Sequence, residues 1–106
     1  MVQVADGTPL PPLPAALEVA AYRVAVEAIV NAARHSDAAE VTATFDATAA
    51  LLTVTVLNDG ASRNGGAWRP GVGLASMRER CEQVGGSLAV GPTPTGGRVE
   101  AVLPLG

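Results

Sequence analysis

The longest regular pattern in the chain is helical and runs from Ala15 to His35. Polar residues recur there every three or four positions among apolar ones, which predicts an amphipathic helix. A helix of this kind needs a second apolar layer to cover its apolar stripe, so the fold is limited to layered architectures. We expect that stripe to consist of Tyr22, Val26, Ile29 and Ala33.

Short segments that alternate apolar and polar residues supply the second layer, because this alternation is typical of half-buried strands. Residues 41–45 and 52–56 are two such segments, and the short turn between them predicts an antiparallel hairpin. Residues 87–90 and 98–103 predict two further strands joined by a glycine-containing turn.

A second helix is expected at residues 72–84, ended by Gly85 and Gly86. The long glycine-containing stretch before it, residues 58–73, is typical of a lid or binding loop. The order of the elements predicts an α+β fold. In this two-layer sandwich, helices cover one face of a mixed, mostly antiparallel sheet.

Three prolines and little periodicity in residues 1–12 predict a leader or linker, followed by one domain over residues 13–106.

Composition and charge narrow the classes of function that the chain can have. The net charge of −3 disfavours binding to nucleic acid, which needs a basic surface. The single cysteine, Cys81, fits a reducing, cytoplasmic setting. No long apolar run is present, so we expect no membrane contact by this fragment, although a parent protein can still be membrane-anchored.

One face of the first helix carries polar groups of complementary chemistry: Glu27, Asn31, Arg34 and His35. The oxygen of Asn31 can complete a Mg²⁺ shell together with phosphate oxygens and water. Glu27 can accept a proton from a nucleophile or orient it, and Arg34 can neutralise phosphate charge. The same spacing also occurs in ordinary amphipathic helices with a solvated face.

Asn58, Asp59 and Gly60 follow the second strand of the hairpin. An acid or amide at a strand end can bond the exocyclic amine of adenine, while a glycine lets the backbone approach the ring. The same three residue types also form simple turns.

Gly71, Val72, Gly73 and Leu74 lead directly into the second helix. The glycines permit backbone N–H groups to approach a phosphate, and the helix N-terminus adds a partial positive charge. A flexible hinge explains this spacing equally well when it is taken alone.

The three motifs together, in this order and spacing, resemble the N, G1 and G2 boxes of the Bergerat-type ATPase fold. That fold is shared by histidine kinases, type II topoisomerases, MutL and Hsp90. The finer resemblance is to the catalytic domain of sensor histidine kinases of the NarL/DesK-like class and covers residues 13–105. Residues 22–35 look like the N box, and residues 71–80 look like the G2 box with its following helix. Residues 85–88, 96–98 and 102–104 look like the C-terminal strands of that family.

The resemblance implies a site for ATP and Mg²⁺. Asn31 would ligate Mg²⁺, and Glu27 would help to activate the reacting group. Asn58 would stand in the place of the adenine-binding Asp of the family. The residues assigned to the nucleotide are Arg34, His35, Asn58, Asp59, Gly60, Gly71, Val72, Gly73 and Leu74.

The chain departs from the family pattern at three positions. The G1 pattern Asp-x-Gly-x-Gly has Asn58 at its first Asp and Ser62 at its second Gly. Because an amide oxygen carries no net charge, we expect a weaker bond to the adenine amine than a carboxylate makes. Arg98 replaces the Thr that usually follows the late pair of glycines.

The resemblance further implies that the chain presents the γ-phosphate of ATP to a histidine on the dimerisation domain of its parent kinase, with a response regulator downstream. The phospho-acceptor helix is not in this sequence, so we expect no autophosphorylation by the fragment alone. Two alternatives are an anti-sigma-factor-like serine kinase and a degenerate module for nucleotide binding or protein interaction.

Overall fold

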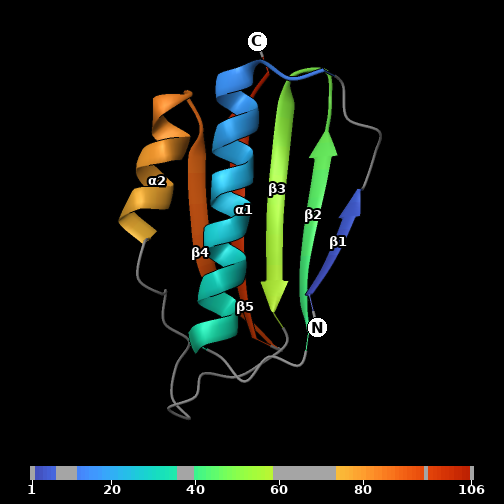
Figure 1. The fold of residues 1–106 in the computed structure, drawn as a ribbon, viewed down its shortest axis with the longest axis vertical. Coiled ribbons are helices and arrows are strands. Elements are labelled where there is room, and N and C mark those ends of the chain that lie inside the picture. The colour runs from blue at the N-terminus through green and yellow to red at the C-terminus, as the bar shows by residue number, and fades with distance from the viewer. Residues whose placement is uncertain (1, 7–11, 36–39, 59–73, 95, 106) are drawn as a thin grey trace.

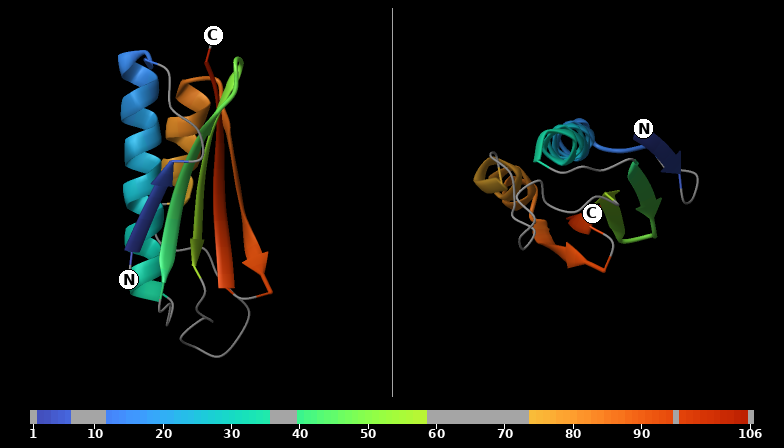
Figure 2. Two further views of the ribbon diagram at one scale, coloured as in Figure 1. Left: turned by 90° about the vertical axis from the view of Figure 1, so that its right-hand side faces the viewer. Right: turned by 90° about the horizontal axis from the view of Figure 1, so that it is seen from below.

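The computed structural model describes residues 2–6, 12–35, 40–58, 74–94 and 96–105. In these residues, five strands form one sheet in the order β1-β2-β3-β5-β4, and two helices lie over one of its faces (Figures 1 and 2). The elements are β1 (Val2–Asp6), α1 (Ala15–His35), β2 (Val41–Ala47), β3 (Leu51–Asn58), α2 (Leu74–Gln83), β4 (Ser87–Thr93) and β5 (Gly96–Pro104).

The predicted fold class is confirmed, because the sheet is mixed, mostly antiparallel and covered by helices on one side. The predicted hairpin of β2 and β3 is also confirmed, and both strands are longer than expected. Their turn is closed at Thr48, whose backbone N–H donates to the Leu51 carbonyl at 2.8 Å. The Thr48 Oγ1 accepts from the Leu51 N–H at 3.0 Å, so one side chain fixes the turn and with it the register.

The strand β1 was not predicted. It lies within residues 1–12, where a leader or linker is expected, and pairs in parallel with β2 from Val2↔Val41 to Asp6↔Phe45. Five residues beside a proline-rich stretch carry little periodicity, and their partner strand lies far along the chain. The strand therefore forms through non-local pairing that a local pattern does not reveal.

The predicted apolar stripe of α1 is wrong at Tyr22 and Val26, which are 66% and 40% exposed. Ile29 is half-buried and packs against the core, and the side chain of Ala33 lies outside the described residues. A largely alanine face packs on the sheet instead, because small side chains let the helix backbone lie close to the strands. The buried residues of α1 are Leu17, Ala20, Ala21, Val24, Ala25, Ala28 and Ala32.

This rotation changes the setting of the polar residues on α1. At about 100° per residue, Asn31 lies about 60° from Ala28, and Glu27 follows it on the same side. Asn31 and Glu27 therefore border the buried face of the helix instead of lying opposite to it.

The helix α2 buries Met77 and Cys81 against the core, and the predicted glycine ending is confirmed. Gly85 has a φ of +79°, which favours glycine. The Gly86 N–H donates to the Cys81 carbonyl at 2.8 Å, and the Gly85 N–H donates to the Glu82 carbonyl at 3.0 Å. These two bonds terminate α2 and turn the chain into β4.

Three elements meet at one end of the molecule. The helix α1 ends there at His35, β3 ends at Asn58, and β5 begins at Gly96 (Figure 1). The strand β5 lies between β3 and β4 and carries buried Ala101 and Leu103 in the core. Residues distant in sequence are thus gathered at this end of the sandwich.

Candidate functional site

Asn58 is the last residue of β3. It points to the helix side of the sheet, on the same face as buried Val54 and Val56. It is 9% exposed and is the only polar residue that is buried in the described part of the chain. Within that part, its Oδ1 is buried without a hydrogen-bond partner. Leaving such an atom unsatisfied costs about 1–3 kcal/mol, so its position calls for a donor from outside the described residues.

Asn31 lies one turn before the end of α1 and is half-buried. Its Nδ2 is buried and makes no hydrogen bond to the residues that the structure describes. Among those residues, Asn31 Nδ2 and Asn58 Oδ1 are the two buried side-chain polar atoms without a partner. One is a donor and the other an acceptor, and both belong to the end of the sandwich where α1 and β3 finish (Figure 1).

Glu27 is half-buried and precedes Asn31 by one turn of α1, so the two side chains share the border of the helix described above. Leu74 is the first residue of α2; it is half-buried and packs against the hydrophobic core. The structure therefore assigns Leu74 a packing contact, in addition to its predicted place in the G2 box.

The remaining predicted residues lie wholly or partly outside the described residues. Arg34 and His35 belong to the last turn of α1, but their side chains lie outside the described residues. The others that lie outside the described residues are Asp59, Gly60, Gly71, Val72 and Gly73. Their assignments stay predictions.

Gly96 was not predicted as a site residue, although it lies against Asn58. A Cβ at position 96 would stand 2.8 Å from Asn58 Oδ1 and closer still to the Asn58 carbonyl oxygen. The proximity arises from the pairing of β3 with β5, which brings Gly97 opposite Asn58. A sequence pattern shows the glycine pair but does not show which strand end it meets.

Arg98 lies on the other face of the sheet. It pairs with exposed Leu57, and its guanidinium forms an ion pair with Glu100 at 2.9 Å. The residue opposite Asn58 is Gly97, which is buried. Arg98 is therefore directed away from the side chain of Asn58.

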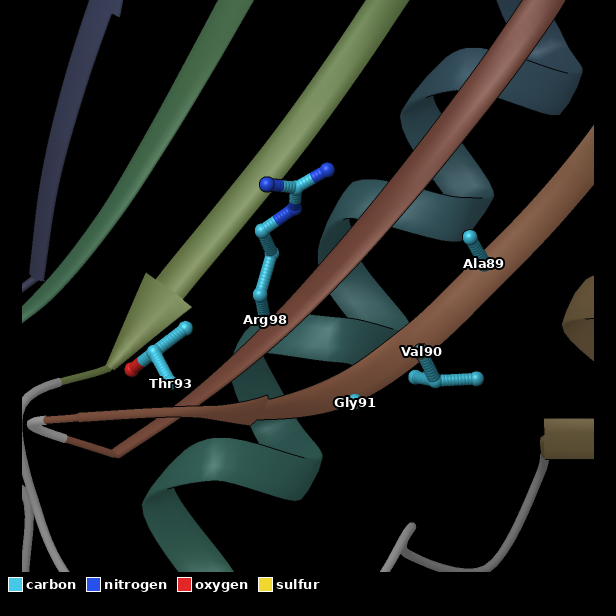
Figure 3. A pocket seen from close by; sticks show the side chains of 5 residues that line it. All are labelled: Ala89, Val90, Gly91, Thr93 and Arg98. Carbon is cyan, nitrogen blue, oxygen red and sulfur yellow. The ribbon is translucent and has the colours of Figure 1, made fainter.

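Two hollows of the described surface lie elsewhere. One of about 220 Å³ is formed on β4 and β5 and is partly lined by Arg98 (Figure 3). Another of about 410 Å³ lies between the start of α1 and the end of α2, where Val19 and Arg80 line it. Neither is lined by Asn31 or Asn58.

The described residues bring few metal ligands together. In the residues covered by the structure, no three His, Cys, Asp or Glu side chains lie together as a metal-binding group. A metal ion at this site would need most of its ligands from a bound molecule and from water, as Mg²⁺ commonly has. None of the described helices combines the length and apolarity that crossing a membrane requires.

Comparison with known proteins shows which proteins the chain resembles in sequence and in fold. The chain is 39% identical over 85 residues to the sensor histidine kinase YxjM of Bacillus subtilis (strain 168). This match covers 79% of the chain and 20% of the kinase, so the chain spans about a fifth of that relative. No protein-family model matches.

Solved structures share the fold. The blue-light activated histidine kinase of Erythrobacter litoralis EL346 superposes with a TM-score of 0.76 at 24% identity, over 98% of this chain and 37% of that one. The ATP binding domain of PrrB from Mycobacterium tuberculosis superposes with a TM-score of 0.64 at 24% identity, over 99% of this chain and 81% of that one. By sequence, the chain is therefore a homologue of part of a sensor histidine kinase, and by fold it has the architecture of the ATP-binding catalytic domain of histidine kinases.

Proposed function

We propose that the chain binds Mg·ATP at the end of the sandwich formed by α1, β3 and β5, and that it does so as the catalytic domain of a cytoplasmic sensor histidine kinase of the NarL/DesK-like class. The observation that carries this proposal is the pair of unsatisfied amide atoms, Asn31 Nδ2 and Asn58 Oδ1. An adenine nucleotide offers a donor to one and acceptors to the other.

The base is assigned to Asn58. Its buried Oδ1 accepts hydrogen bonds only, and the exocyclic amine of adenine is a donor of suitable size. With Oδ1 directed toward the base, Asn58 can therefore accept a hydrogen bond from the adenine amine.

The phosphates and the metal are assigned to the end of α1. The Oδ1 of Asn31 is an oxygen ligand of the kind that Mg²⁺ prefers, and its Nδ2 is free to donate to a phosphate oxygen. Because Mg²⁺ usually keeps several waters and binds phosphate oxygens, a single protein amide fits the sparse ligand supply of the described chain. When bound, the ion neutralises phosphate charge.

The reaction is transfer of the γ-phosphoryl group to a histidine of the dimerisation domain of the parent kinase, and from there to a response regulator. In such a transfer the protein mainly positions the reactants and stabilises charge. Glu27, which precedes Asn31 by one turn of α1, is the residue that we assign to orient the incoming imidazole or to accept its proton.

Isothermal titration with Mg·ADP tests the binding directly. We expect binding by the unsubstituted chain and by Leu57→Ala, whose side chain is exposed on the other face of the sheet, and weaker binding by Asn58→Ala. The transfer is tested by adding the separately expressed dimerisation domain and Mg·[γ-³²P]ATP, which should label a histidine. Absence of heat and of a thermal shift with millimolar nucleotide would instead favour a module that has lost nucleotide binding.

A further inference from the structure

We infer that Gly96 is a positioning residue for the nucleobase. By having no side chain, it lets the start of β5 lie against Asn58 and holds the amide oriented toward the exocyclic amine. This inference rests on the proposed function, because it takes the ligand at Asn58 to be an adenine nucleotide.

The contact between the two residues is close. A Cβ built on Gly96 would meet the carbonyl carbon and the Oδ1 of Asn58, both at 2.8 Å, and the carbonyl oxygen at a still shorter distance. All three of its nearest neighbours thus belong to Asn58. A methyl group there forces either the backbone or the side-chain amide of Asn58 to move.

Gly96 itself is held in place by the β4–β5 hairpin. It pairs with Thr93 of β4, and the next residue, Gly97, pairs with Asn58 of β3. The Oδ1 of Asn58 makes no hydrogen bond within the described chain, so no bond to that atom fixes the orientation of the amide. A Cβ added at Gly96 would stand 2.8 Å from this atom, so the absence of a side chain at Gly96 leaves the amide the position that it has in the structure.

The neighbouring strand supplies a matched control. Gly91 of β4 belongs to the same hairpin and pairs with Arg98. A Cβ on Gly91 would have nothing within 4 Å. The substitutions Gly96→Ala and Gly91→Ala therefore add the same methyl group to one hairpin, and only the first meets Asn58.

The test crosses these variants with a change in the ligand. Affinities are measured for Mg·ADP and for the diphosphate of purine riboside, which carries hydrogen in place of the exocyclic amine. In the unsubstituted chain and in Gly91→Ala, we expect loss of the amine to weaken binding about tenfold, the worth of one hydrogen bond to a buried acceptor. In Gly96→Ala we expect the two ligands to bind within about twofold of each other, because the amine no longer meets the oxygen.

The possible results separate the two claims. A Gly96→Ala chain that loses the same factor for both ligands, or loses none, would show that Gly96 serves the fold alone and would overturn its positioning role while leaving nucleotide binding intact. No binding of Mg·ADP by the unsubstituted chain would overturn the proposed function and this inference with it.

A second measurement needs no variant and so does not depend on whether Gly96→Ala folds. The α-proton resonances of Gly96 are followed by NMR while the unsubstituted chain is titrated with each ligand. We expect ADP and the purine riboside diphosphate to shift the Gly96 signals by different amounts. The α-proton resonances of Gly91 should be the same with either ligand. Identical shifts of Gly96 with both ligands would overturn the inference.

Discussion

A Cβ on Gly86 would stand 2.5 Å from the carbonyl oxygen of Val102, and 2.7 Å from a methyl carbon of Leu103. The end of α2 is therefore joined to β5 through a residue that has no side chain. The Gly86 N–H donates at the same time to the Cys81 carbonyl at 2.8 Å. Helix termination and layer packing thus depend on one position.

We expect Gly86→Ala to lower the free energy of unfolding by about 1–3 kcal/mol, because the added methyl group overpacks the contact with β5. Urea unfolding measures the change. The control is Gly91→Ala, which enters open space and should remain within about 0.5 kcal/mol of the unsubstituted chain. Equal stability of the two variants would contradict the close contact at Gly86.

The core and the open face of the sheet should respond differently to the same truncation. Leu52 is fully buried on β3, whereas Leu57 on the same strand is 41% exposed. We expect Leu52→Ala to cost about 2–5 kcal/mol in thermal or urea unfolding, since it leaves a cavity. Leu57→Ala should cost less than about 1 kcal/mol, and comparable losses would show that the assigned faces of β3 are wrong.

Replacing Asn31 should reduce the contribution of Mg²⁺ to nucleotide binding and have little effect on the free energy of unfolding. Its Nδ2 is buried without a partner in the described chain, so Asn31→Ala removes an unsatisfied group and should leave the free energy of unfolding within about 1 kcal/mol. We expect this variant to lose the difference in ADP affinity between solutions with Mg²⁺ and with EDTA. If Mg²⁺ still strengthens binding to the same extent, Asn31 is not a ligand of the ion.

Replacing Asn58 by the acid of the family should exchange stability for affinity. In Asn58→Asp, a carboxylate would accept a charge-assisted bond from the adenine amine, so we expect tighter ADP binding near neutral pH. Burial raises the pKa of a carboxyl group, so the folded variant binds a proton more tightly than the unfolded chain. Relative to the unsubstituted chain, the free energy of unfolding of this variant should therefore be highest near pH 4 and fall by about 1–3 kcal/mol as pH rises toward 7.

The measurement compares urea unfolding of the two chains across this pH range with titration calorimetry at neutral pH. Asn58→Ala serves as the control, because it has neither charge nor acceptor and should bind ADP more weakly than both. A stability difference that does not change with pH would mean that position 58 is solvated instead of buried.

Cys81 gives a second pH dependence with the same sign. Burial is the main reason that the pKa of its thiol is raised; nearby Glu82 adds to the effect and Arg78 opposes it. The folded chain keeps this proton longer than the unfolded chain does, so the stability linked to it is present at neutral pH and is lost as pH rises above about 8.5.

The difference in free energy of unfolding between the native chain and Cys81→Ala should accordingly be constant below that range and shrink above it. Urea unfolding at several alkaline pH values measures this difference. In the folded native chain, thiol reagents should react slowly with Cys81, because the side chain is fully buried. Parallel pH curves for the two chains would contradict an effect of the thiol.

Local sequence patterns were sufficient to predict an element where periodicity or turn chemistry is contained within that element. The helix from Ala15 to His35, the hairpin of β2 and β3 and the glycine ending of α2 follow from periodicity and turn chemistry. The buried face of α1 did not follow, because apolar residues surround the helix almost completely and alanine packing chose the face. Tyr22 and Val26 would complete a good apolar stripe by spacing, yet they are exposed.

The candidate site likewise contains residues that the local sequence indicates and one residue that it does not. Asn31 and Asn58 were identified by residue type and order, and the structure adds that each holds a buried atom without a partner in the described residues. Gly96 was missed because its contact with Asn58 arises from the pairing of β3 with β5, and the facing of strands far apart in sequence has no local signature.

The position of β5 also bears on how the chain folds. It is the last strand in sequence, yet it lies between β3 and β4, and its pairing with β3 joins residues as far apart as Leu51 and Pro104. The β2–β3 and β4–β5 hairpins form from neighbouring residues, but the sheet that joins them must wait for a large loop to close. Until β5 is inserted, β3 has an unpaired edge. The slowest step of folding is therefore expected to be the step that brings Gly96 to Asn58, so the site and the completed sheet should appear together.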